Sequence, residues 1–274
     1  VNQQETMRLF SALLAVILVT CTVHTSNKTG VCISPYTAAT NCDDFQQLTS
    51  PVWYYNWQIN STFYKMQCKS NDLRNAEFVP QIWGWYNQTL TVHSVPPGTK
   101  AILGFNEPNF KAQSNLQPAD AVQGWKVIQS VFPNMTLVSP SASPCSGSQC
   151  IPNYGTQIEW FDEFFALCNG TCKVDYLAVH YYYCHPYDLL GSLQQLYDLY
   201  GLKIWLTEFN CPGGNLTEQT QFMQQVIPLM EQQDWIVRYA WFMDRESTNA
   251  PEVLLNSNAS KATLTKLGKT FNSF

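Results

Sequence analysis

The sequence has little charge. Only 13% of its 274 residues are Asp, Glu, Lys or Arg, which is about half the share that is usual in soluble proteins. The net charge is −5, and the 15 Lys and Arg residues form no cluster. Partners that are polyanions require concentrated positive charge, so this composition argues against a nucleic-acid partner. With so few charges on the surface, we expect attached sugar to help keep it solvated.

Long hydrophobic runs are missing as well. The apolar run at 9–19, just after Arg8, is shorter than a membrane-spanning helix requires. Small and polar residues follow it, which is the layout of a secretory signal peptide, whereas a buried core helix is the alternative. We expect residues 1–25 to be this signal peptide, with translation starting at Met7. No apolar tail follows at the carboxyl end, so neither a lipid anchor nor membrane attachment is expected.

The cysteines indicate an oxidising compartment. Cys21 lies in the expected signal peptide, and the nine others are more than a reduced compartment would explain. A zinc site is the alternative, but no pair of His residues accompanies the cysteine spacings. Because nine is odd, one thiol is expected to stay free. Three disulfide pairs are geometrically plausible: Cys145–Cys150, Cys168–Cys172 and Cys184–Cys211.

Asn-x-Ser/Thr sequons agree with a secreted, extracellular glycoprotein. Such sequons mark surface loops that carry glycans in secreted proteins. The sequence has seven of them, at Asn27, Asn60, Asn87, Asn134, Asn169, Asn215 and Asn258.

Linkers, low-complexity segments and charge blocks are absent from residue 30 onward. Short apolar runs alternate there with amphipathic stretches, as expected for βα units around a parallel sheet. Helical periodicity follows Pro118, spans 158–168 and precedes Gly201. The runs that qualify as strands are 30–33, 52–57, 78–84, 101–106, 136–141, 176–181, 203–208 and 237–242. The sequence therefore predicts an α/β fold, a (β/α)8 TIM barrel in one compact domain over 26–274.

Carboxylates stand at the carboxyl ends of two expected strands. In a TIM barrel this rim is the active-site face. "GFNEP" ends the fourth strand with Glu107, "WLTEFN" ends the seventh with Glu208, and "LAVHYYY" ends the sixth with His180 and Tyr182. A single loop carboxylate is usually only solvated, but two at equivalent strand ends suggest chemistry. Glycoside hydrolysis requires such a pair, one to protonate the leaving oxygen and one to attack or to activate water.

Aromatic side chains near the same strand ends meet a second requirement of sugar binding. Trp and Tyr rings stack on the apolar C–H faces of sugars, while their polar tips remain free to hydrogen-bond. Core packing is the alternative role for some of them. The aromatic residues near strand ends are Trp53, Tyr55, Trp57, Trp83, Trp85, Tyr182 and Trp241. Among these we expect Tyr55, Trp83, Tyr182 and Trp241 to bind substrate.

Ordered sequence blocks also carry a family resemblance over nearly the whole mature chain. The blocks are "WYYNW", "FVPQIWGW", "LGFNEPN", "LVSPSAS", "VDYLAVHYY", "IWLTEFNC", "RYAWFM" and "LTKLGKTF". In this order they resemble glycoside hydrolase family 128, a clan A TIM-barrel family of β-1,3-glucanases. The resemblance implies Glu107 as acid/base, Glu208 as nucleophile and Asn106 as the residue that holds the sugar 2-hydroxyl. It also implies substrate contacts at His180, Tyr182 and Trp241.

The resulting prediction is a secreted, monomeric, retaining endo-β-1,3-glucanase without metal or organic cofactor. Glu208 would attack the anomeric carbon, while Glu107 would protonate the leaving oxygen and then activate water. The many rim aromatics suggest an open groove along a β-glucan chain, and hence endo action. Two alternatives stay open: a clan A hydrolase of another β-glycan, such as a β-1,4-linked polymer, and a non-catalytic β-glucan-binding protein on the same scaffold.

Overall fold

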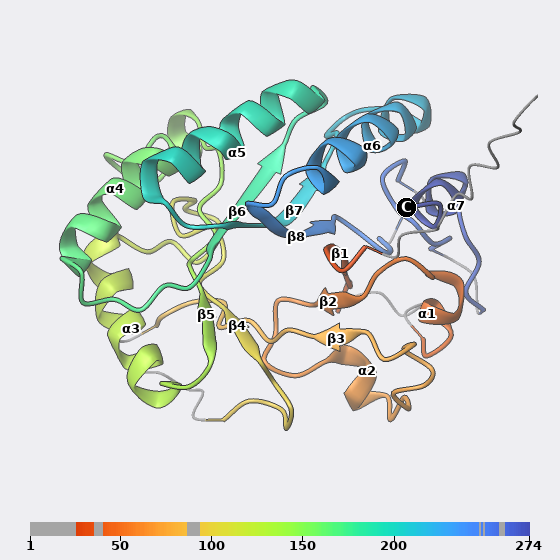
Figure 1. Ribbon diagram of the computed structural model, residues 1–274, viewed down its shortest axis with the longest axis horizontal. Coiled ribbons are helices and arrows are strands. Elements are labelled where there is room, and N and C mark those ends of the chain that lie inside the picture. Colours follow the sequence, from red (N-terminus) through yellow and green to blue (C-terminus); the bar gives the residue numbers. More distant parts are fainter. Residues whose placement is uncertain (1–25, 36–40, 87–93, 247, 249, 258–260) are drawn as a thin grey trace, which may run out of the picture.

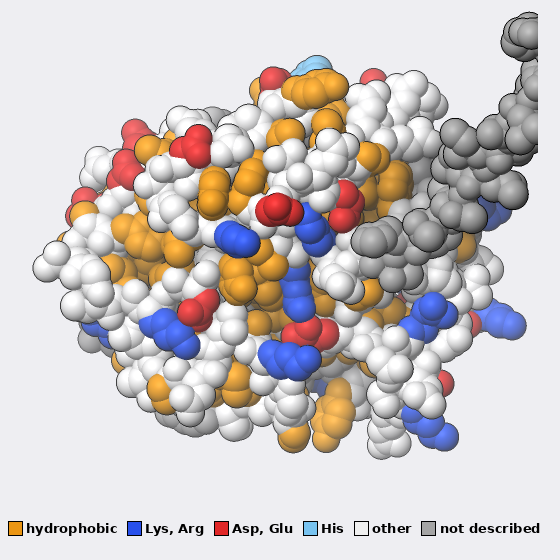
Figure 2. Space-filling view, viewed as in Figure 1, with side chains coloured by type: hydrophobic (Ala, Val, Ile, Leu, Met, Phe, Trp, Pro, Cys, Tyr) orange, Lys and Arg blue, Asp and Glu red, His pale blue; other side chains and the backbone are white. Residues whose placement is uncertain are grey.

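The computed structural model describes residues 26–35, 41–86, 94–246, 248, 250–257 and 261–274 (Figure 1). The expected signal peptide at 1–25, with Cys21, lies outside the described residues and stays a prediction. No helix in the described part combines the length and the apolar character that crossing a bilayer requires. On the face drawn in Figure 2, Lys and Arg side chains are interspersed with Asp and Glu instead of forming one basic patch.

Eight parallel strands of the described chain follow one another around a barrel. Their bounds are β1 Thr29–Cys32, β2 Trp53–Tyr55, β3 Glu77–Phe78, β4 Ala101–Leu103, β5 Thr136–Val138, β6 Leu177–Tyr182, β7 Ile204–Asn210 and β8 Ile236–Trp241. One sheet has the order β3-β2-β1-β8-β7-β6, and β4 pairs with β5. Isolated parallel bridges, Gln81↔Leu103 and Val138↔Tyr176, join these two sheets on both sides. The circuit of strands is therefore closed, which confirms the predicted TIM-barrel fold.

Each predicted strand is present, although several bounds differ. The ladders of β2, β3, β4 and β5 end before the apolar runs do, although most of the side chains that follow them are still buried. Single bridges continue the pairing there, as between Asn106 and Ser141. β6 and β7 instead extend beyond prediction, to Tyr182 and Asn210. An apolar run in the sequence indicates which residues are buried. An assigned strand ends at its last hydrogen-bonded pair with a neighbouring strand, so the two ends can differ.

Long helices cover one side of the barrel and short ones the other (Figure 1). The long helices are α3 Pro118–Val131, α4 Gln157–Cys168, α5 Pro186–Tyr200 and α6 Leu216–Glu231; the short ones are α1 Asp44–Gln47, α2 Thr62–Lys65 and α7 Lys266–Phe271, with a 3-10 turn at Gly147–Gln149. α3, α4 and α5 confirm the predicted helical stretches. α6 was not predicted, although a capping box from Asn215 to Glu218 marks its start.

Buried apolar side chains form two clusters, one between the strands and the helices and one inside the barrel. Trp53 and Trp205 fill the inside, and the guanidinium of Arg238 lies over both rings, 4.5 Å from the Trp205 centroid. A Cβ on Gly30 would lie 2.3 Å from the Trp53 ring. The first strand thus carries glycine because a neighbouring indole occupies that space.

Four disulfides tie the loops of the described chain, and they include all three predicted pairs. These are Cys145–Cys150, Cys168–Cys172 and Cys184–Cys211, and the fourth is Cys42–Cys68. Among the described residues Cys32 is free, and its side chain is buried in β1. Cys184–Cys211 joins the loops that follow β6 and β7, at the end of the barrel where the predicted site lies.

Candidate active site

Glu107 lies just beyond β4 in a backbone conformation that is unusual for a residue with a side chain. Its φ is 39°, in the left-handed region. Two backbone hydrogen bonds hold this turn: the Glu107 N–H donates to the Ser141 carbonyl at 3.1 Å, and the Phe110 N–H donates to the Glu107 carbonyl at 3.0 Å. The side chain that results is only 8% exposed. Strained backbone of this kind is concentrated at functional sites, where surrounding structure compensates for it.

A bulge in β7 points Glu208 into the barrel. β6 and β7 pair Val179 with Leu206 but His180 with Glu208, so Thr207 has no partner on β6. Trp205 belongs to the inner cluster, whereas Leu206 and Phe209, three residues apart, both belong to the outer one. In a regular strand Glu208 would face outward with Leu206, because side chains alternate. The extra residue reverses that alternation.

The bulge is accommodated by hydrogen bonds inside the barrel. The Thr207 carbonyl accepts a hydrogen bond from the Tyr55 hydroxyl at 3.0 Å, and its own hydroxyl donates to the Val179 carbonyl at 3.2 Å. Buried backbone groups left out of a ladder are costly unless they find such partners. Tyr55 therefore supports the local geometry that places Glu208.

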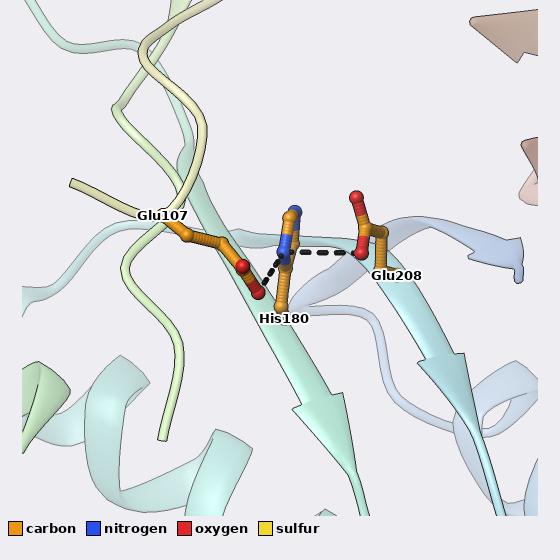
Figure 3. Close-up of side chains that lie close together, drawn as sticks. All are labelled: Glu107, His180 and Glu208. Carbon is orange, nitrogen blue, oxygen red and sulfur yellow. Dashed lines mark hydrogen bonds and ion pairs between the residues drawn. The ribbon is translucent and has the colours of Figure 1, made fainter. Parts of the chain in front are cut away.

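His180 lies between the two carboxylates (Figure 3). Its Nδ1 is 3.0 Å from Glu107 Oε1 and 3.3 Å from Glu208 Oε2. One oxygen of each carboxylate and a ring nitrogen all lie within 4.8 Å of one another. The imidazole is fully buried, and its Nε2 finds no hydrogen-bond partner among the described residues. Two carboxyl groups and an imidazole are thus held together in one buried cluster.

Three side chains donate hydrogen bonds to the Glu208 carboxylate. The Trp57 indole N–H donates to Oε1 at 2.7 Å, and the Tyr182 hydroxyl donates to Oε2. The Tyr55 hydroxyl lies 3.0 Å from Oε1 and shares its single proton between that oxygen and the Thr207 carbonyl. An ionised carboxylate offers only acceptors, so a shell of donors matches its charged form. Trp57 also has a φ of 56°, a second left-handed residue beside the cluster.

Burial and charge act in opposite directions on this cluster. On balance the pKa of Glu208 is raised, chiefly by burial and also by the nearby Glu107, although the His180 charge and the hydrogen bonds from Tyr182 and Trp57 lower it. Burial alone would lower the pKa of His180, but the two carboxylates outweigh burial and raise it. The two carboxylates therefore favour the protonated form of His180, whose positive charge would offset theirs.

Asn106 is held on both sides of its amide. Its Oδ1 accepts from Gln81 Nε2 at 3.4 Å, and its Nδ2 donates to Gln113 Oε1 at 3.2 Å. Its backbone N–H donates to the Trp83 carbonyl at 2.8 Å, which links the end of β4 to the segment after β3. The amide is thus oriented before any ligand arrives, which lowers the entropic cost of using it for binding.

These groups open into a pocket of about 580 Å³ at the carboxyl ends of the strands. This volume is within the usual range for small-molecule sites. Aromatic rings, amides and carboxylates share the wall, which suits the mixed apolar and hydroxylated faces of a sugar. The lining residues are Ser34, Trp57, Trp83, Asn106, Glu107, Gln113, Tyr182, Glu208, Phe242, Met243 and Glu246.

A family model described as the glycosyl hydrolase catalytic core matches residues 30–271. The chain belongs to this family. Similar solved structures include the family 128 subgroup II endo-β-1,3-glucanase of Sorangium cellulosum, with 28% identity, a TM-score of 0.75, and coverage of 90% of this chain and 98% of that one. Another is the curdlan-specific exo-β-1,3-glucanase of Blastomyces gilchristii, with 25% identity, a TM-score of 0.67, and coverage of 90% and 98%. The expected resemblance to family 128 is confirmed.

The chain is also similar to a curated protein. Alkali-sensitive linkage protein 1 of Schizosaccharomyces pombe is 30% identical over 234 residues, which are 79% of this chain. The chain spans 39% of the length of that relative.

Five of the predicted site residues line the pocket, namely Asn106, Glu107, Trp83, Tyr182 and Glu208. Tyr55 and His180 are fully buried, and they contact the carboxylates without being part of the pocket wall.

The prediction for Trp241 is corrected by its position. Its ring packs in the outer cluster against Phe209 and Phe222, and its indole N–H donates to the Glu252 carbonyl at 2.8 Å. Tyr239 faces the same outer cluster, and Ala240 between them faces the inner one. The next residue, Phe242, lines the pocket instead. Alternation along β8 therefore turns Trp241 away from the site.

Several pocket residues were not assigned a site role from the sequence: Ser34, Trp57, Gln113, Phe242, Met243 and Glu246. Trp57 could have been assigned to the site from the sequence, because it lies at the end of the second predicted strand in "WYYNW". Gln113 and Glu246 come from loops with no motif that distinguishes them from solvated polar residues.

The spacing of Glu107, His180 and Glu208 would also allow them to ligate a metal ion. Their other contacts argue for hydrogen bonding instead. The Glu208 oxygens already accept from Tyr55, Trp57 and Tyr182. A metal would have to compete with these donors for the same lone pairs.

Proposed function

We propose that this glycosyl hydrolase is a retaining endo-β-1,3-glucanase in which Glu208 is the nucleophile and Glu107 the acid/base. The observation that carries the proposal is the cluster of Glu107, His180 and Glu208 at the base of the pocket. Oxygens of the two carboxylates lie within 4.8 Å. Retaining enzymes hold their carboxyl groups about 5–5.5 Å apart, whereas inverting enzymes leave about 6.5–9.5 Å for a water molecule. The short separation supports double displacement.

The hydrogen bonds of the two carboxylates support this assignment of roles. Glu208 receives donors on both oxygens, so it is the carboxylate prepared to be negatively charged and to attack the anomeric carbon. Glu107 contacts His180 through Oε1, and it is placed to give its proton to the oxygen of the departing sugar. The attack forms a glycosyl–Glu208 ester and breaks the glycosidic bond. Glu107 then takes a proton from water, whose oxygen displaces Glu208; this frees Glu208 as a carboxylate and restores Glu107 as the protonated acid.

Asn106 contributes to binding the sugar at which cleavage occurs. Its amide lies in the pocket wall next to Glu107 and is oriented by Gln81 and Gln113. A hydrogen bond from this amide to the 2-hydroxyl strengthens as positive charge develops at the anomeric carbon. Trp83 and Trp57 supply aromatic surface in the same wall.

The choice of β-1,3-glucan and of endo action is supported by similar proteins. The Sorangium structure is described as an endo-β-1,3-glucanase, and so is that of Pseudomonas viridiflava, which has 27% identity and a TM-score of 0.74. The Blastomyces structure is described as an exo enzyme in complex with glucose. Exo action is therefore the competing hypothesis within the family. Hydrolysis of a different β-glycan and glucan binding without catalysis also stay open as hypotheses.

Hydrolysis assays on purified protein test the proposal. Reducing-sugar release is expected from laminarin and not from cellulose or mannan, with mixed oligosaccharides and an early fall in viscosity. Glucose as the sole initial product would favour exo action, and release from cellulose or mannan alone would refute the β-1,3 assignment. Binding of laminarin without release would indicate a non-catalytic glucan-binding protein. Proton NMR of the first product is expected to show the β-anomer, and an initial α-anomer would exclude Glu208 as nucleophile.

We also propose that residues 26–274 form the catalytic domain of a secreted, monomeric protein whose residues 1–25 are removed as a signal peptide. The four disulfides support this location, because such bonds persist in oxidising compartments. Expression in a eukaryotic secretory host is expected to release glycosylated protein into the medium, and mass spectrometry would read the mature amino terminus. Retention of the chain in the cell would contradict the proposal.

A further inference from the structure

Two aromatic rings extend from the pocket wall onto the surface. Trp83, which lines the pocket, lies beside Tyr86, with ring centroids 6.2 Å apart and ring planes inclined by 25°. The two rings are therefore nearly parallel. Trp83 is half-buried, whereas Tyr86 is 55% exposed.

The Tyr86 ring packs against the backbone of Gly84. A Cβ on Gly84 would lie 2.9 Å from Cε2, Cζ and Oη of Tyr86, closer than side-chain atoms normally approach. The tyrosine ring thus folds back over the chain at a position that has no side chain. Packing against a glycine backbone holds the ring in place while the rest of it remains exposed to solvent.

Trp83 lies next to the proposed site of bond cleavage. The Trp83 carbonyl accepts the Asn106 backbone N–H at 2.8 Å, so the position of Trp83 is fixed relative to the amide that would hold the reacting sugar. Trp83 lines the pocket, whereas Tyr86 beside it is outside the pocket wall. The exposed Tyr86 ring beside Trp83 extends the aromatic surface beyond the pocket wall.

We propose that Trp83 and Tyr86 form a sugar-binding platform that holds a β-glucan chain beyond the unit bound at Asn106. The platform rests on the proposed function, because it needs a polymeric sugar substrate. Its chemistry is the stacking of aromatic faces on the apolar C–H faces of glucosyl units. Tyr86 contributes to the binding of long chains and makes no contact with the reacting atoms.

Calorimetric titration tests the platform, using laminari-oligosaccharides from the disaccharide to the hexasaccharide. Glu208→Gln serves as the background so that the ligand is not consumed. Tyr86→Ala in this background is expected to weaken binding of the longest oligosaccharide by roughly three- to tenfold, the range for loss of one aromatic contact. Binding of the disaccharide stays the same. Tyr86→Phe keeps the ring and is expected to keep the affinity.

Two further variants separate the platform from a general surface effect. Gly84→Ala adds only a methyl group, which pushes the Tyr86 ring aside, and is expected to reproduce the length-dependent loss. Tyr187→Ala removes another exposed tyrosine, 74% exposed and outside the pocket lining, and is expected to change nothing. Thermal melting would verify that each variant is folded.

The outcomes distinguish this inference from the proposed function. If the wild type hydrolyses β-1,3-glucan but Tyr86→Ala and Tyr187→Ala bind every oligosaccharide equally well, the platform is refuted and the function stands. If no laminari-oligosaccharide binds or is hydrolysed, both are refuted. An equal loss for all lengths, including the disaccharide, would also refute a platform beyond the reacting sugar.

Discussion

Tyr182→Phe removes a single oxygen atom from the proposed active site. The lost hydroxyl donates to Glu208 Oε2, whereas the ring, which lies edge-on to Phe242 at 5.6 Å, is retained. Shape and packing are thus kept, and only the donor disappears. We expect slower glycoside hydrolysis, because the ionised Glu208 loses one of the hydrogen bonds that hold it in position for attack.

The size of the effect follows from the kind of bond. A hydrogen bond to a charged group contributes about 1.5–3 kcal/mol. If the bond acts fully in the transition state, kcat/KM falls by roughly ten- to a hundredfold. Because Trp57 and Tyr55 still donate to the other oxygen, we expect a value near the lower end.

The pH profile gives a sharper test than the rate alone. A hydrogen bond to the charged form lowers the pKa of Glu208, so its removal raises that pKa. The nucleophile must be ionised, and the acidic limb of kcat/KM is therefore expected to move to higher pH. The loss of activity is largest in acid and becomes smaller as the pH rises.

Tyr181→Phe is the matched control on the same strand. It also removes one phenolic oxygen, but that hydroxyl bonds to Ser192 Oγ at 3.0 Å on the outer side of the barrel. Reducing-sugar release from laminarin would be measured across pH for both variants, and melting temperatures would verify folding. If Tyr182→Phe keeps the wild-type rate and profile, or if both variants shift alike, the role given to this hydroxyl is wrong.

Three further predictions concern catalysis and stability. Glu107→Ala is expected to lose glucan hydrolysis yet still react with an activated aryl glucoside, and added azide should give a β-glucosyl azide by NMR; an α-azide would contradict double displacement. Asp44→Ala leaves the fully buried Arg245 without the carboxylate 2.6 Å away, so denaturant unfolding should show a loss of about 3–5 kcal/mol, and a loss under about 1 kcal/mol would refute this. Replacing Cys184 and Cys211 by Ala removes a cross-link over 27 residues; a thermal scan should show destabilisation equivalent to about 3–4 kcal/mol, and an unchanged melting temperature would count against it.

Much of the fold could be predicted from the sequence because its signals are local. Apolar runs such as 101–106 and 203–208 identify buried parallel strands whatever their partners are. α6 was missed although its own start signal was present, since an internal Pro228 and a Gln-rich face obscure the helical period. The pairings of cysteines close in sequence were predictable for a simple reason: short spacing limits the choices.

The site was predictable in part, for a different reason. Carboxylates at the ends of predicted strands, such as Glu107 and Glu208, can be recognised from the sequence as candidate catalytic residues. Which way a ring points depends on alternation, and alternation depends on bulges and on pairing between strands. Trp241 and Phe242 are neighbours in sequence with similar chemistry, and only the packing of β8 against α6 decides which one reaches the pocket.

The bulge in β7 also limits how this strand can change in evolution. A substitution at Thr207 leaves the number of residues between Trp205 and Glu208 unchanged, so the carboxylate still points inward. Deleting or inserting one residue between them would turn every later side chain to the opposite face and exchange Glu208 with Phe209. The strand can therefore diverge by replacement but not by gaps, and a sequence alignment that opens a gap between these two positions has placed the strand wrongly.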